Sequence, residues 1–316
     1  MEHTSEIINR VLPVLMLIGL GHWVRRSRFL PESTIDDLRK IAVTIALPSV
    51  LFVSFLEIEL KTEYLVLFVV MFGLCVALFG LGTLLKRLLK IEQAYFPFLI
   101  TGFEYGMLGI SLFGSAYGLE KIGYIAVVDL GHEIFIWFVF LALLLVKRDG
   151  LQKPGQLINA FVRSPVIIGI LAGLFFNMVG ARELLYNSAV TGAVMASLQF
   201  LSNLTIPLIL IIVGYGIKLD RSGIREALPV LAVRLILLIP LALVLNTVLI
   251  RTLLRLEPAF EAAFFTLLVL PPPFIVPLYM RSESADERRY VNNALTLYTL
   301  VSIILFGLYV ATHPFI

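Results

Sequence analysis

Long apolar segments recur along the whole chain and are separated by short polar stretches. Each is about 17–25 residues long, the length at which an α-helix crosses the hydrocarbon core of a bilayer. The pattern predicts an all-α polytopic membrane protein with about ten transmembrane helices, at 7–24, 36–56, 64–85, 95–117, 121–146, 164–180, 192–216, 228–250, 261–280 and 292–313. The connections are too short to hold a separate soluble domain.

Two of these helices are broken near mid-length. The fourth, within 96–118, contains Glu104 and several glycines, and the ninth, within 264–280, contains Pro271, Pro272, Pro273 and Pro277. Unpaired backbone groups and charges are costly in hydrocarbon, so such helices persist only where they line a cavity inside the protein. Paired breaks in corresponding helices indicate a transporter binding site.

The two halves of the chain resemble each other. KIEQAYFPF (90–98) is similar to RLEPAFEAA (255–263), and Pro48 and Pro207 follow similar apolar stretches in the second and seventh helices. We therefore predict two five-helix repeats, 1–150 and 151–316. Because each contains an odd number of helices, the second is expected to be inverted relative to the first.

The distribution of Lys and Arg predicts the orientation. Alternate loops carry most of these residues: Arg25, Arg26, Arg28, Lys86, Arg87, Lys90, Lys147, Arg148, Lys153, Arg163, Lys218, Arg221, Arg225, Arg281, Arg288 and Arg289. The opposite loops carry only Lys61, Lys121, Arg182, Arg251 and Arg255. The positive-inside rule then places both termini on the extracytoplasmic side of the plasma membrane. In the longest loop, 147–163, the stretch QLINAFV is suited to the membrane interface.

Composition agrees with these predictions. With 59% hydrophobic and 15% charged residues, the chain does not resemble a soluble globular domain or a nucleic-acid-binding protein. The single cysteine, Cys75, allows no intrachain disulfide and no cysteine metal site. The segment MEHTSE lacks the basic start of a signal peptide, so we expect the first helix to be retained.

Ionisable residues inside the predicted membrane region are candidates for function. Glu104 lies about ten residues into its helix, or ~15 Å deep, and can carry a proton; the alternative is a structural carboxylate bonded to unwound backbone N–H groups. Asp129, His132 and Glu133 share one face of the fifth helix, at a similar depth. They are predicted to relay a proton or cation, or else to form a self-satisfied polar cluster between helices.

Other polar residues have simpler interpretations. His132–Glu133 does not predict a zinc protease, because a second His is needed four residues after the first and residue 136 is Ile; neither a metal site nor an enzyme is predicted. Arg234 is expected to snorkel to the cytoplasmic interface, the alternative being a counter-ion. Asn203 and Thr205 are predicted to line the substrate cavity, as are Thr44 and Ser49, unless they bond to their own helices.

The chain resembles the auxin efflux carrier family. The similarity covers the opening LPVLMLIGLGHWVRRSRFLPESTIDDLRKIAVTIALPSVLF, the fourth-helix stretch FEYGMLGISLFGSAYG, PPPFIVPLYMRSESADERR in the ninth helix and ALTLYTLVSI in the tenth. The resemblance implies ten helices in two inverted five-helix repeats, with helices four and nine unwound where they cross. The chain departs from the family motif Asn-x-Gly-x-x-Gly-x-Pro, since Glu104 stands in place of Asn and Ser111 in place of Pro.

These observations predict secondary active transport of a small organic solute, an organic anion or carboxylate, coupled to protons or Na⁺. Glu104, Asp129, His132 and Glu133 would carry the coupling ion, and no cofactor other than H⁺ or Na⁺ is expected. The predicted substrate-binding residues are Tyr105, Gly106, Gly109, Ser111, Asn203, Thr205, Pro271, Pro272 and Pro273. The partners expected are the solute, membrane lipid and a second copy of the chain. Two alternatives remain open: a cation/proton antiporter without an organic substrate, and a transporter-like membrane sensor.

Overall fold

The computed structural model describes residues 2–59, 61–149, 162–217, 221–280 and 285–313, and every regular element among them is helical. Helical segments lie at all ten predicted positions: α1 (Glu2–Arg26); α2 (Glu32–Ile41) continuing into α3 (Leu47–Glu57); α4 (Tyr64–Leu88); α5 (Phe96–Ile100) with α6 (Ile110–Tyr117); α7 (Ile122–Phe135) with α8 (Leu141–Asp149); α10 (Pro165–Met178); α12 (Ala189–Gly216); α13 (Arg221–Leu245); α14 (Pro258–Val269) with α15 (Val276–Tyr279); and α16 (Ala285–Thr312). The prediction of an all-helical protein is confirmed.

Several helices contain local variations that the apolar pattern did not predict. π-Helical turns lie at Ala42–Ala46, Tyr105–Gly109, Ile136–Phe140 and Asn246–Leu254, and a 3₁₀ turn at Leu119–Lys121. A short extra helix, α11 (Arg182–Asn187), joins α10 to α12. The predicted repeat boundary at 150 and nearly all of the QLINAFV stretch lie outside the described residues.

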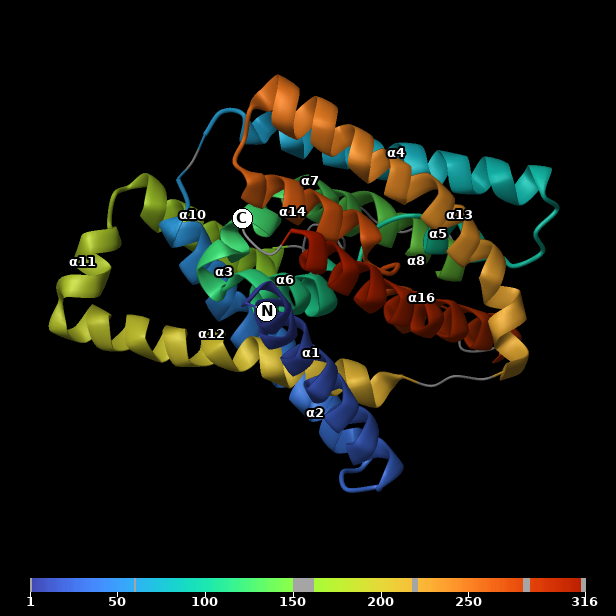
Figure 1. Ribbon diagram of the computed structural model, residues 1–316, viewed down its shortest axis with the longest axis horizontal. Coiled ribbons are helices and arrows are strands. Elements are labelled where there is room, and N and C mark those ends of the chain that lie inside the picture. The colour runs from blue at the N-terminus through green and yellow to red at the C-terminus, as the bar shows by residue number, and fades with distance from the viewer. Residues whose placement is uncertain (1, 60, 150–161, 218–220, 281–284, 314–316) are drawn as a thin grey trace.

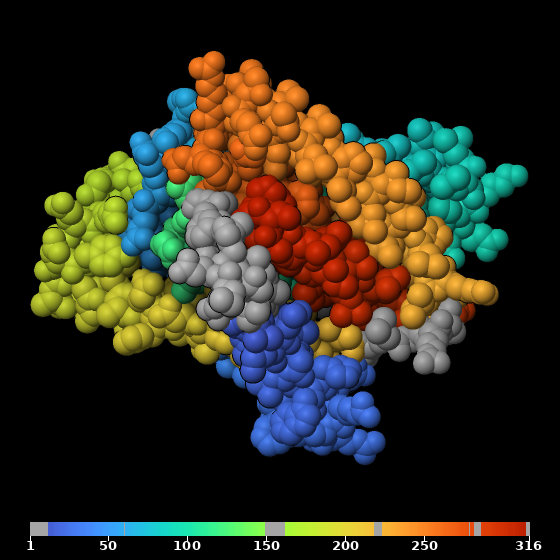
Figure 2. All heavy atoms as spheres, viewed as in Figure 1, coloured from blue at the N-terminus to red at the C-terminus, as the bar shows by residue number. Residues whose placement is uncertain are grey.

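Length and composition support a multi-pass membrane protein. Seven helical segments within the described ranges are long and apolar enough to cross a bilayer: Glu32–Glu57, Tyr64–Leu88, Phe96–Tyr117, Leu119–Arg148, Ala189–Gly216, Gly223–Leu254 and Asp286–Thr312. Pro165–Met178 and Pro258–Val269 are shorter apolar helices. Large apolar side chains such as Phe200 on α12, Ile236 on α13 and Leu308 on α16 stand exposed, as a lipid-facing surface requires. These helices form much of the face seen in Figure 2.

The helices pack in two groups (Figure 1). In one, α1 lies against α12, and α3 lies against α10 and α12. In the other, α4 packs on α7, while α13 packs on α14 and α16. Helix α6 lies between the groups, touching α1 and α12 on one side and α7 and α16 on the other. The broken segment that contains α6 is therefore central.

Burial confirms that the broken fourth segment is shielded from lipid. In the apolar window of Phe96–Tyr117, 89% of the residues are buried, against 22% in Gly223–Leu254. Helix breaks leave backbone N–H and C=O groups unpaired, and only surrounding protein or a water-filled cavity can satisfy them.

Glycines allow α1 and α12 to approach closely. A Cβ atom at Gly21 would clash with the Ile211 carbonyl oxygen, and one at Gly214 with the Ile18 carbonyl oxygen. Gly19, two residues before Gly21 on the same helix, has nothing within 4 Å of its Cβ position. Close backbone contact through small residues is a common means of helix association in membranes.

We predict that Gly21→Ala lowers the melting temperature of the purified protein, since overpacking a close contact costs about 1–3 kcal/mol. The matched control Gly19→Ala should be neutral or slightly stabilising, because Ala restricts the unfolded chain. Thermal unfolding of both variants in detergent would measure the difference. Equal melting temperatures would contradict the described contact between α1 and α12.

Candidate functional site

The two breaks meet at the centre of the molecule. Helix α5 ends at Ile100 and the helix resumes at Tyr105, while α14 ends at Val269 and α15 begins at Val276. The Glu104 backbone N–H donates to the Pro271 carbonyl oxygen at 2.8 Å, which joins one break to the other. We call this junction, residues 101–104 and 270–275, the crossover.

Local sequence explains both breaks. Leu270 is extended, with ψ of 154°, because the following Pro271 disfavours the helical conformation, and three consecutive prolines supply no backbone N–H. Gly102 has φ of +73°, a conformation that favours glycine, and a Cβ there would strike Pro273 and Ile136. Residues with side chains of ordinary size would not fit this turn.

One cation satisfies the carbonyl ends of both half-helices. The guanidinium of Arg234, on α13, is fully buried. It donates to the carbonyl oxygens of Leu99 (3.1 Å), Ile100 (3.0 Å), Gly102 (3.1 Å) and Leu270 (2.9 Å). Its guanidinium carbon also lies 5.4 Å from the centre of the Phe103 ring and 4.8 Å from that of Tyr298. A positive charge at helix C-termini offsets the negative end of the helix dipole.

One anion satisfies the N–H groups that follow the breaks. Glu104 Oε1 accepts from the Met107 backbone N–H at 3.2 Å, which caps the helix that starts at Tyr105. Its Oε2 accepts from the Phe274 backbone N–H at 2.5 Å, across the crossover. Both carboxylate oxygens thus act as acceptors for backbone N–H groups. These two hydrogen bonds match the structural alternative for Glu104, in which its carboxylate bonds to unwound backbone N–H groups.

The acidic face of α7 divides into two parts. Asp129 and His132 are buried, and His132 Nδ1 lies 2.7 Å from Asp129 Oδ1. His132 Nε2 accepts from the Phe103 backbone N–H at 2.9 Å, so the ring proton is on Nδ1 and His132 is neutral. This pair holds the unwound chain in place. Glu133 is only half-buried, and its Oε1 accepts from Trp137 Nε1 at 2.9 Å.

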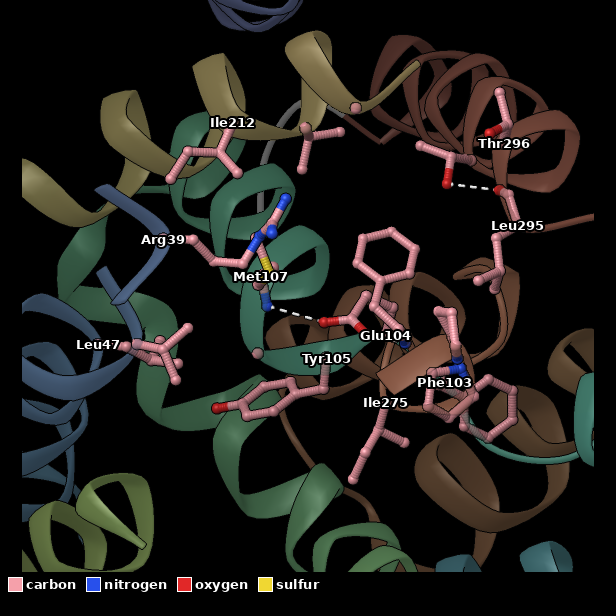
Figure 3. A pocket seen from close by; sticks show the side chains of 18 of the residues that line it. Arg39, Leu47, Phe103, Glu104, Tyr105, Met107, Ile212, Ile275, Leu295 and Thr296 are labelled. Atoms are coloured by element: carbon pink, nitrogen blue, oxygen red, sulfur yellow. Dashed lines mark hydrogen bonds between the residues drawn. The ribbon is translucent and has the colours of Figure 1, made fainter. Parts of the chain in front are cut away.

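A cavity of about 490 Å³ ends on the crossover. Its inner wall includes Phe103, Glu104, Tyr105, Glu133 and Thr299. At the outer end lie the exposed Glu32 and Asp36 and the half-buried Arg39 of α2, together with the exposed Gly216 of α12 and Asn292 of α16. Figure 3 shows Glu104 in the middle of the lining, between Arg39 and Leu47 on one side and Leu295 and Thr296 on the other.

The predicted substrate-binding residues are not all brought together. Tyr105, Gly106 and Pro273 line the cavity, together with Glu104, His132 and Glu133. Pro271 and Pro272 shape the break behind it, and Gly109 packs against Leu270. The Ser111 and Thr205 hydroxyls bond to carbonyls of their own helices, as do those of Thr44 and Ser49. Asn203 lines a different cavity, of about 390 Å³, beside Glu57 and Glu120.

The prediction that Arg234 snorkels was wrong, because its side chain is fully enclosed and turned toward the crossover. Sequence reasoning also missed Phe103, Trp137 and Thr299 as lining residues. For Arg234 there was one available signal, a lone cation within the long apolar run of α13. Its partners are backbone carbonyls, however, and leave no mark in the sequence.

We predict that Arg234→Lys sharply lowers stability and yield. A lysine ammonium cannot reproduce the planar fork that reaches four carbonyls, and each buried acceptor left unpaired costs about 1–3 kcal/mol. Arg225→Lys, an exposed position on the same helix, is the control and should behave as the original protein. Melting temperature and the monodisperse fraction after purification would measure the effect, and an Arg234→Lys variant as stable as the control would contradict this role.

Comparison with known proteins gives the family. Residues 6–161 match the model of a family described as membrane transport protein. An uncharacterized transporter of Methanothermobacter thermautotrophicus is 24% identical over 304 residues, which span 93% of this chain and 94% of that relative. The chain therefore belongs to the membrane transport protein family, the auxin efflux carrier family that its motifs resemble, and is a multi-pass membrane transporter rather than an enzyme.

Proposed function

We propose that the protein is a secondary active transporter that moves a small organic solute by alternating access around the crossover. The observation that carries this proposal is the cavity of about 490 Å³, which leads from exposed helix ends to two broken helices. A volume of this size suits a small organic molecule rather than a bare ion. Tyr105, Gly106 and Pro273 are the predicted binding residues that would contact it.

Two inverted five-helix repeats, 1–150 and 151–316, would explain how the helices pack. If each helix is replaced by its counterpart in the other repeat, the contact of α1 with α12 corresponds to that of α10 with α3. The contacts of α4 with α5 and α7 likewise correspond to those of α13 with α14 and α16. Each half then contributes one broken helix to the crossover, as in other transporters built from inverted repeats.

The mouth of the cavity supports an inward-facing state. Its exposed residues follow or precede loops rich in Lys and Arg, after α1, after α12 and before α16. The positive-inside rule assigns these loops to the cytoplasm and both termini to the outside. The second cavity, beside Glu57 and Glu120, lies at the opposite helix ends. Cavities at both ends of a central crossover fit a site that opens to each side in turn.

Among the four predicted coupling residues, we propose Glu133 as the carrier of H⁺ or Na⁺. Glu104 has both oxygens engaged by N–H groups, and His132 Nε2 is occupied by the Phe103 N–H. Glu133 faces the cavity and has a hydrogen bond from Trp137 alone among its described contacts. Ligand atoms of Asp129 and Glu133 lie within 4.8 Å of each other, a distance over which two carboxylates can share a small cation.

The same cluster would suit the second candidate, a cation/proton antiporter without an organic substrate. The size of the cavity favours the organic solute. The organic anion implied by the family resemblance requires a further condition: because Glu104 and Glu133 face the cavity, an anion would enter only together with coupling cations.

Orientation can be tested by cysteine labelling in a Cys75→Ala background. We predict that Ser27→Cys reacts with a membrane-impermeant maleimide only from the cytoplasmic side, and Glu183→Cys only from outside. Both positions are exposed, and each follows the first helix of its half. Inverted halves place these corresponding loops on opposite faces, whereas labelling from the same face would contradict the inverted repeat.

Coupling can be tested with glutamine variants reconstituted in liposomes. We predict that Glu133→Gln loses the dependence of uptake on an imposed proton or Na⁺ gradient, because an amide cannot carry the ion. Glu59→Gln, an exposed acid beside Lys61 that lines neither cavity, is the control. Uptake driven by each gradient separately, beside counterflow, identifies the ion. Gradient-driven uptake that persists in Glu133→Gln would exclude Glu133 as the carrier.

A further inference from the structure

Glu104 occupies the place where the crossover would otherwise bind an anion. Unpaired N–H groups at the start of a helix attract carboxylates through direct hydrogen bonds and the helix dipole. The helix that runs from Tyr105 through Tyr117 presents such groups toward the cavity, and Glu104 Oε1 already accepts from Met107 N–H. Its Oε2 accepts from Phe274 N–H. The protein's own carboxylate thus fills the site for a solute carboxylate.

The charges around the cavity also disfavour a solute carboxylate. Four carboxylates line it, those of Glu32, Asp36, Glu104 and Glu133. Of the described lining residues the one basic side chain is Arg39, which is paired with Asp36 at 2.6 Å near the mouth. His132 is neutral, as its hydrogen bonds require. Arg234 lies behind the crossover, where it is occupied by carbonyl groups.

Glu133 is the part of this lining that lacks a compensating cation. Its carboxylate receives a neutral donor, Trp137 Nε1. A carboxylate at membrane depth is stabilised by a cationic partner, and none of the described side chains within the cavity supplies one to Glu133. Aromatic rings of Phe103, Trp137 and Phe274 also line the cavity. Carboxylates together with aromatic faces are the surroundings that bind ammonium groups.

We propose that the solute carries a positively charged amino or ammonium group, that this group pairs with Glu133, and that Glu104 excludes solute carboxylates from the crossover. The proposal rests on the proposed transport function and replaces the organic anion by an organic cation. Burying a solute cation beside Glu133 balances the charge of the cavity, whereas a solute anion would add to the repulsion.

A pair of probes with similar shape and opposite charge tests this directly. Tetramethylammonium and trimethylacetate are both compact, and each bears a single charge. Trp137 can report their binding in a Trp23→Phe background, because the chain contains only these two tryptophans. We expect tetramethylammonium to change Trp137 fluorescence saturably, with at least about ten-fold higher affinity than trimethylacetate, a difference of ~1.4 kcal/mol.

Two variants give opposite expected results. Glu133→Gln should weaken tetramethylammonium binding about ten-fold or more. Glu104→Ala should free the N–H groups and create measurable affinity for trimethylacetate. Glu104→Asn serves the same purpose if the alanine variant does not fold, because its amide oxygen can still accept one hydrogen bond. Glu59→Gln, an exposed acid paired with Lys61 away from the cavity, should bind both probes as the original protein does.

Tighter binding of trimethylacetate than of tetramethylammonium by the original protein would overturn the proposal. The proposal would also be overturned if Glu133→Gln and the folded Glu104 variant both kept the original preference for tetramethylammonium over trimethylacetate. Flux of labelled tetramethylammonium into liposomes keeps the two proposals distinguishable. Charge-selective binding without flux would contradict transport alone, and flux of carboxylates would contradict the organic cation alone.

Discussion

The structure depends on how backbone groups are satisfied where two helices stop inside a membrane. A break exposes carbonyl groups at one helix end and N–H groups at the next, and hydrocarbon offers neither a partner. Here one cationic and one anionic side chain bind the free backbone groups at both breaks. Arg234 binds carbonyls that end α5 and α14, while Glu104 binds N–H groups on both sides of the crossover. Because each charge bridges both segments, it also fixes the two broken helices to one another.

This arrangement explains which features the sequence could predict. Helix positions and breaks depend on local properties, namely segment length, apolar content, prolines and glycines. The breaks were located, and helix ends were predicted to within about seven residues. The role of Arg234 depends on carbonyls more than 130 positions away, in α5 and just after it, which carry no side-chain signature. Its depth alone suggested snorkelling. Asn203 lines the second cavity and not the one at the crossover for a related reason, since hydropathy does not define which face of α12 meets the crossover.

Hydrogen bonding separates acids that the sequence grouped together. Glu104, Asp129 and Glu133 have similar predicted depths, so depth alone suggested one relay. In the structure Asp129 orients His132, which anchors Phe103, and Glu104 caps the N–H groups of the crossover. The contacts of His132 require its neutral form. Glu133 has fewer such constraints and faces the cavity, which is why we propose it as the acid that exchanges a proton or cation during transport.

The same constraint indicates how one substitution changes selectivity without changing the fold. The crossover requires an acceptor at position 104, and either the Asn typical of the family motif or the Glu of this chain provides an oxygen. An amide leaves the positive helix end uncompensated and able to attract an anion. A carboxylate supplies the negative charge itself and reaches two N–H groups. We therefore propose that position 104 can reverse the charge preference of the cavity, while Arg234 and the breaks remain as they are.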